Sequence, residues 1–255
     1  MAGRHAVVTG GGRGIGAAIA DELARVGAAL TLLGRDRERL DAHASALRER
    51  YDVRVETFAC DVADAGSVAA AFAGAREALG EVQVLVNNAG QSAAAGFAEM
   101  PRETWDRMLA VNLTGTYLCT REVIPAMSAA GWGRVVNVAS TAGLRGYPMT
   151  AAYCAAKHGV VGLTRALALE TAKLGITVNA VCPGYTDTDM AQAAADNLVR
   201  ALGKTPDEAR RMLARVNPLG RLIDPAEVAS AVAWLCSPGA SGVTGQALAV
   251  SGGEV

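Results

Sequence analysis

The chain has 255 residues, of which 51% are hydrophobic and 4% aromatic, and its net charge at pH 7 is −1. This charge balance offers nucleic acid and anionic membranes no electrostatic attraction, and no apolar run is long enough to span a membrane. The five cysteines are scattered without a CxxC pair, the three histidines are far apart, and the N-terminal stretch lacks a signal-peptide pattern. We therefore expect a cytoplasmic protein with reduced thiols, no metal site, and no nucleic-acid or membrane partner.

A glycine-rich turn lies between a short apolar run, residues 4–9, and an amphipathic helical pattern. In a strand–turn–helix setting, glycines let the backbone approach a pyrophosphate, and the helix N-terminus offers free N–H groups and the positive end of its dipole. The turn therefore predicts a dinucleotide site. We expect this site to include Gly10, Gly12, Arg13, Gly14, Ile15 and Gly16.

The end of the second predicted strand, residues 28–33, bears on the choice between the two nicotinamide cofactors. Gly34 stands where an NAD site usually places a carboxylate for the ribose hydroxyls. Arg35 and Arg13 could instead form a guanidinium pair for a 2′-phosphate. Both arginines could also be ordinary solvated side chains, and the neighbouring Asp36 keeps NAD(H) open. The sequence favours NADP(H) over NAD(H).

A third strand is predicted over residues 53–58, after a charged helix over residues 36–50. Asp61 and Val62 follow it, and the carboxylate at this position could reach the adenine amino group of the cofactor. Asp64 is expected to cap the next helix.

A fourth strand, residues 82–86, leads into paired amides and a glycine, a pattern that suggests close backbone approach to a ligand or a turn without one. A long helix is then predicted from Pro101 to about Met127. It carries Asn112 on an apolar face, where a polar group needs a partner, either a neighbouring element or a chain of waters. From the turn after the fourth strand we expect cofactor contacts by Asn88, Ala89 and Gly90.

The fifth predicted strand, residues 134–138, leads to Ser140 at the edge where open parallel sheets bind ligands. A helix over residues 151–174 carries Tyr153 and Lys157, which share one face because they are four positions apart. A free phenol has a pKa of about 10, and we expect the ammonium to lower the pKa of Tyr153 toward the range useful for proton transfer. A surface lysine beside a half-buried tyrosine would give the same spacing.

After a sixth strand over residues 176–181, the chain becomes Ala-rich. We expect residues 186–222 to fold over the mouth of the site as a mobile lid. A final strand is predicted over residues 246–250. The repeated βα units predict a single α/β domain over residues 1–255, a doubly wound Rossmann-type parallel sheet of about seven strands with helices on both faces.

In its motifs the chain closely resembles the short-chain dehydrogenase/reductase family over nearly its full length. The matching residues, in family order, are Thr9–Gly16, Asp61, Asn87–Gly90, Asn112, Ser140, Tyr153 with Lys157, and Pro183–Gly184. The resemblance implies an NAD(P)-dependent oxidoreductase that interconverts a ketone and a secondary alcohol, with hydride passing between the nicotinamide and the substrate carbon.

The same resemblance implies roles for single residues. Ser140 would hydrogen-bond the substrate oxygen, and Tyr153 would donate or accept the proton. Lys157 would lower the pKa of Tyr153 and hold the nicotinamide ribose, and Tyr153 would contact the cofactor as well. Asn112 would position a water of a proton relay.

The resemblance further places Pro183, Gly184 and Thr186 at the nicotinamide, with Thr186 near its carboxamide. Family members are mostly homotetramers, joined through the helix after Pro101 and the tyrosine-bearing helix. We therefore expect a homotetramer.

Within the family the chain is most similar to polyketide ketoreductases and other reductases of 3-oxoacyl thioesters, notably in residues 157–170 and 217–229. Carrier-protein reductases carry basic residues that dock an acidic carrier. The matching places here, residues 128–132 and Leu169, are uncharged, although an acidic partner would require cations. This departure favours a coenzyme A thioester or a free small keto compound.

Two alternatives stay open beside a 3-oxoacyl reductase. One is a dehydrogenase of another small hydroxy compound, of the 3-hydroxybutyrate, cyclic alcohol or sugar type. The other is a non-catalytic NAD(P) sensor, since fold alone does not establish activity. A sensor would not need all four of Asn112, Ser140, Tyr153 and Lys157.

The substrate pocket is expected to involve the loop over residues 142–150 and the lid, through Leu144, Arg145, Tyr147, Met149 and Tyr185. Arg145 could meet a carboxylate or a phosphate, or face solvent.

Overall fold

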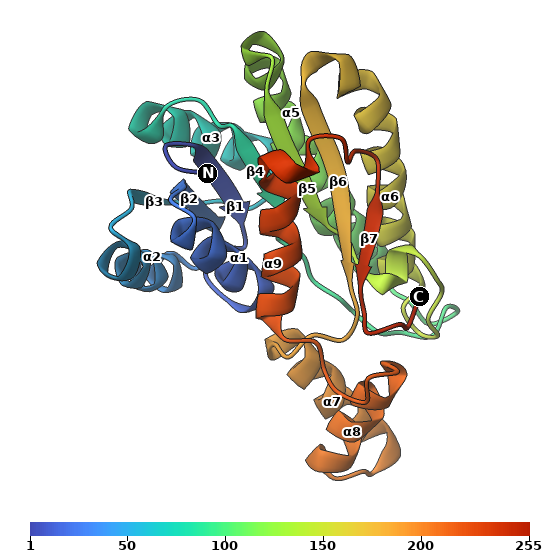
Figure 1. Cartoon of the computed structure of the whole chain (residues 1–255). Coiled ribbons are helices and arrows are strands. Elements are labelled where there is room, and N and C mark those ends of the chain that lie inside the picture. The colour runs from blue at the N-terminus through green and yellow to red at the C-terminus, as the bar shows by residue number, and fades with distance from the viewer.

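The computed structural model describes all 255 residues and contains one seven-stranded sheet (Figure 1). Every strand pairing is parallel, in the order β3-β2-β1-β4-β5-β6-β7. The strands are β1 (His5–Thr9), β2 (Ala29–Gly34), β3 (Val55–Ala59), β4 (Val84–Asn87), β5 (Gly133–Val138), β6 (Ile176–Pro183) and β7 (Ala247–Val250). The predicted doubly wound α/β sheet is confirmed, and its strand order reverses between β1 and β4.

Helices cover both faces of the sheet (Figure 1). One apolar core forms against α1 (Gly14–Arg25), α2 (Arg37–Tyr51) and α9 (Pro225–Cys236), and the other against α3 (Ala65–Leu79), α5 (Gly115–Ala130) and α6 (Ala151–Thr171). Because side chains alternate along a strand, Ala6 and Val8 of β1 enter the first core and Val7 the second. Burial on both faces explains why the central strands are almost wholly apolar.

The helix predicted from Pro101 to about Met127 is present and runs without a break from Arg102 to Ala130, but one turn of it is not α-helical. The structure divides it into α4 (Arg102–Leu109), a π-helical turn (Ala110–Thr114) and α5, which runs on to Ala130. The side-chain amide of Asn112, in the π turn, donates to the carbonyl oxygen of Met108 at 3.0 Å. A side chain that bonds the preceding turn competes with the backbone ladder, and single π turns of this kind are frequent at functional sites.

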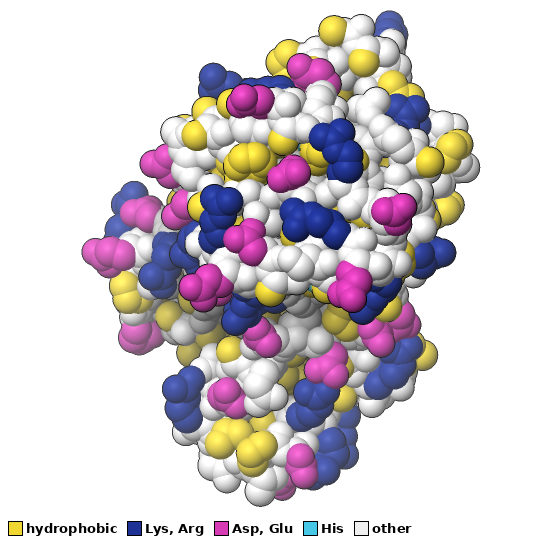
Figure 2. Space-filling model, turned by 90° about the vertical axis from the view of Figure 1, so that its left-hand side faces the viewer, with side chains coloured by type: hydrophobic (Ala, Val, Ile, Leu, Met, Phe, Trp, Pro, Cys, Tyr) yellow, Lys and Arg dark blue, Asp and Glu magenta, His cyan; other side chains and the backbone are white.

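Two helices, α7 (Asp189–Leu202) and α8 (Pro206–Val216), form a hairpin beyond the carboxyl end of β6 (Figure 1). The two helices are separated at Gly203, whose φ is 62°. The hairpin has a small apolar core of its own, built on Ala195, Ala209 and Leu213. In space-filling view it is the lower lobe, and acidic and basic side chains are interspersed over the visible face (Figure 2).

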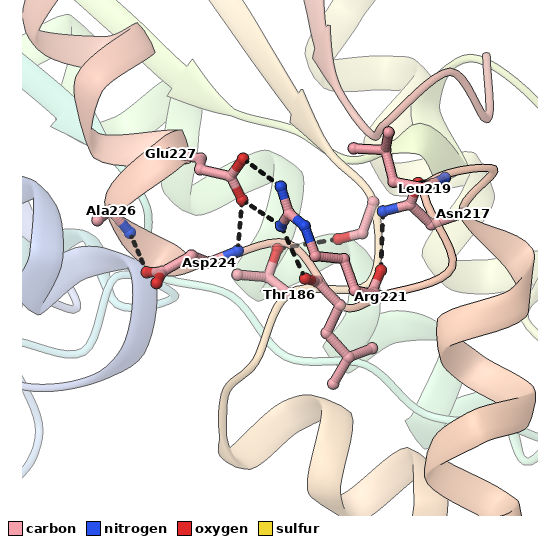
Figure 3. A network of polar contacts seen from close by, with 9 residues as sticks. Thr186, Asn217, Leu219, Arg221, Asp224, Ala226 and Glu227 are labelled. Carbon is pink, nitrogen blue, oxygen red and sulfur yellow. Dashed lines mark hydrogen bonds and ion pairs between the residues drawn. The ribbon is translucent and has the colours of Figure 1, made fainter.

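The two ends of the hairpin are joined at its base. Thr186 and Ile223 form a parallel bridge, and the N–H of Ile223 donates to the carbonyl oxygen of Tyr185 at 2.9 Å. Beside it, the guanidinium of Arg221 donates to both oxygens of Glu227, at 2.6 and 2.8 Å (Figure 3). Glu227 also completes the capping box that begins α9. The hairpin therefore joins the sheet through a hydrogen-bonded base.

None of the helices combines the length and the apolar character that crossing a membrane requires.

Candidate active site

The glycine turn is held to the neighbouring strand at the point where the strand order reverses. The Thr9 hydroxyl accepts from the backbone N–H groups of Asn88 and Ala89, each at 2.9 Å. The side-chain amide of Asn88 donates back to the carbonyl oxygens of Thr9 at 2.9 Å and Gly10 at 3.3 Å. Asn88 thus fixes the turn with its side chain. This is the position where open parallel sheets bind their ligands.

The glycine turn is tightly packed and leaves the first helical N–H groups open. A Cβ atom at Gly16 would collide with the carbonyl oxygen of Gly10, and Gly10 itself has a φ of 67°. Arg13, the residue that precedes α1, makes no side-chain cap. The first-turn N–H groups of α1, including those of Gly14 and Ile15, therefore have no side-chain acceptor, which leaves them for an anion. The predicted cofactor turn fits a dinucleotide.

Cations gather where the adenosine end of a dinucleotide would lie. Arg35, directly after β2, is exposed and makes no ion pair. Arg13 pairs with Asp189 of the hairpin at 3.3 Å, and Arg39 lies 3.7 Å from the same carboxylate. Asp36 accepts the N–H of Arg39 at 3.1 Å and so caps α2. The sequence did not single out Arg39, although its place one helical turn after Arg35 is a usable signal.

Asp61 and Val62 take different environments after β3. Asp61 is exposed, and one of its carboxylate oxygens accepts the N–H of Ala63 at 3.0 Å. Val62 is buried in the core of the α3–α5 face, where a Cβ atom at Gly115 would lie 2.8 Å from its side chain. Asp64 caps α3 by accepting the N–H of Ser67 at 2.6 Å, as predicted.

Ser140, Tyr153 and Lys157 meet at the carboxyl end of β5. The Ser140 hydroxyl accepts the N–H of Ala142 at 3.1 Å and begins a short 3₁₀ turn. The side chain of Lys157 is buried, and its ammonium donates to the carbonyl oxygen of Val138 at 2.8 Å. The same ammonium lies 5.7 Å from the centre of the Tyr153 ring. The spacing seen in the sequence therefore corresponds to a shared site.

Burial dominates the ionisation of this site. It raises the pKa of Tyr153 to about 12, an effect that the hydrogen bond to Ser140 partly opposes. It also lowers the pKa of Lys157 to about 8. The expectation that Lys157 holds the pKa of Tyr153 below that of a free phenol was wrong. The physical reason is that the ammonium faces the Val138 carbonyl, while desolvation penalises the phenolate directly.

Asn112 ties the helix to the loop after β4. Its amide donates to the carbonyl oxygen of Gln91 at 2.9 Å, and its side-chain oxygen accepts the N–H of Gln91 at 3.2 Å. Gly90 fits between Asn112 and the lysine, because a Cβ atom there would lie 2.8 Å from the Asn112 oxygen and 3.7 Å from the Lys157 ammonium. Asn112 therefore has a partner in a neighbouring element, the loop after β4.

Pro183, Gly184 and Thr186 lie at the end of β6. Pro183 is its last residue, and the N–H of Gly184 donates to the carbonyl oxygen of Val250 at 3.1 Å. The Thr186 hydroxyl is buried and donates to the carbonyl oxygen of Gly184 at 3.0 Å. This hydroxyl therefore supports the turn after β6.

Three of the residues predicted to line the substrate pocket lie in different environments. Leu144 packs on the core beside Val160, and Met149 is 57% exposed with a φ of 65°. Tyr185 packs on the α7–α8 hairpin, and burial raises its pKa.

Arg145 and Tyr147 meet a residue that the sequence did not single out. The Tyr147 hydroxyl donates to the carboxylate of Glu254, and Arg145 lies over the Tyr147 ring at 5.1 Å from its centre. Burial, followed by the hydrogen bond to Glu254, raises the pKa of Tyr147. A carboxylate directly after the two glycines of the tail was the available signal.

All five cysteines are free and buried, and no three His, Cys, Asp or Glu side chains lie close enough to share a metal ion.

Residues 4–198 match the short chain dehydrogenase family, and the chain belongs to it. Ketoacyl reductase 1 of the granaticin polyketide synthase from Streptomyces violaceoruber is 44% identical, over 97% of this chain and 92% of that protein. The 3-oxoacyl-[acyl-carrier-protein] reductase of Aquifex aeolicus is 35% identical, over 99% and 98%. The crystal structure of a single-residue variant of the actinorhodin polyketide ketoreductase with NADPH has a TM-score of 0.95 and 42% identity, over 98% and 97%. The chain is an NAD(P)-dependent oxidoreductase that interconverts a ketone and a secondary alcohol.

Proposed function

We propose that this enzyme reduces a 3-oxoacyl thioester to its 3-hydroxyacyl form, with Tyr153 as the proton donor. The observation that carries the proposal is the meeting of Ser140, Tyr153 and Lys157 beside the glycine turn. The ketoacyl reductases among the relatives support the substrate class. A sensor of the cofactor would have no use for a half-buried phenol and a buried ammonium at this place.

The chain's own residues account for positioning and proton transfer. When bound, the cofactor supplies the hydride for the substrate carbon. Ser140 offers a hydroxyl to the substrate oxygen, and Tyr153 transfers its phenolic proton to that oxygen. A phenol whose pKa is raised to about 12 is protonated at neutral pH, which suits an acid in the direction of reduction. Lys157, with a pKa lowered to about 8, is still mostly charged at pH 7, and we propose that its ammonium holds the nicotinamide ribose.

The cofactor is proposed to be NADP(H). Asp36 is the only acid in the stretch from Gly34 to Arg37, and its carboxylate caps α2 and lies 3.5 Å from the Arg39 guanidinium. It is therefore engaged and poorly placed to accept ribose hydroxyls. Arg35 has no ion-pair partner and can donate to a 2′-phosphate, and Arg13 on the adjacent turn can join it by exchanging its contact with Asp189, 3.3 Å away, for the phosphate.

The substrate is proposed to be a coenzyme A thioester or a small free keto compound. Leu169, on the outer face of α6, is 84% exposed, and residues 128–132 carry no charge. An acidic carrier protein would find no cations at these two places. We further propose that the α7–α8 hairpin acts as the lid over this substrate.

A homotetramer and a cytoplasmic location complete the proposal. Exposed apolar side chains on α5 and α6, Tyr117 at 48% and Leu169 at 84%, support an assembly through these helices. Five reduced cysteines are typical of the cytoplasm. Light scattering after gel filtration measures the assembly.

The test is a spectrophotometric screen of NADPH and NADH against acetoacetyl-CoA, 3-oxo esters and simple ketones. We expect the highest kcat/KM with NADPH and acetoacetyl-CoA. No turnover of any 3-oxo compound would contradict the proposal. Faster oxidation of 3-hydroxybutyrate with NAD⁺ would favour the hydroxy-acid dehydrogenase instead.

A further inference from the structure

The C-terminal tail places a buried carboxylate beside the predicted substrate wall. The side chain of Glu254 is 1% exposed, and the Tyr147 hydroxyl donates to one of its oxygens. The phenol oxygen of Tyr147 also lies 2.7 Å from the Thr141 hydroxyl. Because the phenol has one proton and a carboxylate only accepts, Thr141 donates to the phenol and the phenol to Glu254. Thr141 directly follows Ser140, so this chain of hydrogen bonds begins at the catalytic strand end.

The C-terminal tail also packs against the turn after β6 and against Asn217. A Cβ atom at Gly184 would lie 3.1 Å from the second Glu254 oxygen, which has no hydrogen-bond partner. Gly252 approaches the Asn217 side chain so closely that no Cβ atom would fit. The C-terminus lies next to the loop that precedes α6 (Figure 1). Glu254 therefore connects the turn after β6 with the loop over residues 144–150.

Leu144 packs on the core, the N–H of Arg145 donates to the carbonyl oxygen of Thr141 at 3.0 Å, and the Thr150 hydroxyl donates to the carbonyl oxygen of Tyr147 at 3.1 Å, so the two ends of the loop are held locally. Its middle has fewer contacts. Arg145, Gly146, Pro148 and Met149 are exposed, and Arg145 reaches Glu254 only at 4.0 Å. One backbone hydrogen bond of 2.8 Å, from the N–H of Ala95 to Met149, fixes its far end. Burying a carboxylate costs free energy unless the carboxylate is hydrogen-bonded. Because Glu254 needs the hydrogen bond from Tyr147, this bond holds the loop against the tail.

We propose that Glu254 is a positioning residue for the substrate wall: through Tyr147 it holds the loop over residues 144–150 in place and sets the acyl chain length that the enzyme accepts. This inference rests on the proposed function. On this proposal, a long acyl chain lies along the wall, whereas a short 3-oxo compound reaches Tyr153 without touching it. Loss of the contact between Tyr147 and Glu254 should therefore change the selectivity between short and long substrates more than it changes the rate of hydride and proton transfer.

The kinetic test compares ethyl acetoacetate with ethyl 3-oxodecanoate for Glu254→Gln, Tyr147→Phe and the double variant. We expect each single variant to change the ratio of the two kcat/KM values by at least about fivefold, and the double variant to match the singles, because both remove one contact. NADPH affinity should stay within about twofold. An unchanged ratio in both single variants, or single effects that multiply, would overturn the proposal.

A second hydrogen bond between a tyrosine and a carboxylate, far from this loop, serves as the control. The Tyr51 hydroxyl donates to the Asp21 carboxylate at 2.7 Å, between α2 and α1. Tyr51→Phe and Asp21→Asn remove an equivalent phenol–carboxylate bond far from the substrate wall. Their thermal stability can fall, but their chain-length ratio should equal that of the wild type. A purely structural role of Glu254 would give the same result as this control.

A second readout does not depend on turnover. A Cβ atom at Gly146 meets nothing within 4 Å, and the five native cysteines are buried, so Gly146→Cys accepts a spin label selectively. We expect the label to become more mobile in the Glu254→Gln background and unchanged with Asp21→Asn. Equal mobility in both backgrounds would show that Glu254 does not hold the loop. If the wild type reduced no 3-oxo compound, the proposed function would fail while the label still decided whether Glu254 holds the loop.

Discussion

The ammonium nitrogen of Lys157 lies 2.8 Å from the carbonyl oxygen of Val138 and joins α6 to the end of β5 that leads to Ser140. The contact explains how a lysine that is only 5% exposed is tolerated in the interior. It does not remove the cost of burial, which lowers the pKa of this ammonium to about 8. The free energy of unfolding should therefore change with pH in the alkaline range because of this residue.

We expect the free energy of unfolding of the wild type, relative to that of Lys157→Met, to increase as pH rises above 8. The folded state releases the lysine proton near pH 8 and the unfolded state near pH 10.5, so between these values the unfolded state binds more protons and stability increases with pH. Between pH 8 and pH 9.5 the gain is about 2 kcal/mol. Urea unfolding at several pH values measures it. Lys173→Met, at an exposed lysine, is the control; a gain of the same size there would contradict the assignment.

Replacement of Tyr153 by Phe removes the proton donor and little else. We expect kcat/KM for ketone reduction to fall by about 10²–10⁴-fold, the range of general acid catalysis. NADPH binding, followed by fluorescence, should change by less than about threefold, since the phenol is expected to act on the substrate. Tyr51→Phe should retain full activity. Substantial turnover by Tyr153→Phe would exclude this residue as the acid.

Replacement of Arg35 by Ala tests the cofactor preference. Loss of a charge-assisted hydrogen bond to a 2′-phosphate should raise the Kd for NADPH by about tenfold or more, while the Kd for NADH stays the same. Isothermal titration at two salt concentrations measures both. Arg37→Ala is the matched control, because this arginine is two residues away and lies 3.6 Å from Asp41. If Arg35→Ala weakened both cofactors equally, the arginine would not discriminate between them.

Replacement of Glu227 by Gln tests the base of the α7–α8 hairpin. The hydrogen bond from Arg221, followed by that from the N–H of Asp224, lowers the pKa of Glu227 to about 2. Because the site is solvent-exposed, the expected loss of unfolding free energy at pH 7 is only about 1 kcal/mol. The stabilisation is present above pH 4.5 and is lost as pH falls toward 2, so the two proteins should converge in acid. Glu77→Gln, at an exposed glutamate without an ion pair, should show neither effect in denaturant titrations.

The fold and the centre of the site were within reach of the sequence because both follow from local patterns. Alternation and helical periodicity depend on near neighbours, and they predicted the order of strands and helices. The glycine turn and the four-residue spacing of Tyr153 and Lys157 are local as well. Their meeting with Ser140 could be expected because the carboxyl ends of parallel strands lie at one edge.

Other properties depend on residues far apart in the chain. The contact of Tyr147 with Glu254 spans 107 positions, and that of Arg13 with Asp189 spans 176. No periodicity relates such pairs, so neither contact was predicted. The hydrogen bond from Asn112 to Gln91 likewise joins two separate segments.

For the reaction, the sequence determined which groups are present and the tertiary structure decided how they ionise. Tyr153 and Lys157 were expected to interact directly, with the charge lowering the pKa of the phenol. In the folded protein both groups lose water, so the pKa of the phenol rises to about 12 and that of the ammonium falls to about 8. Desolvation depends on everything packed around a group, and only the complete tertiary structure determines it.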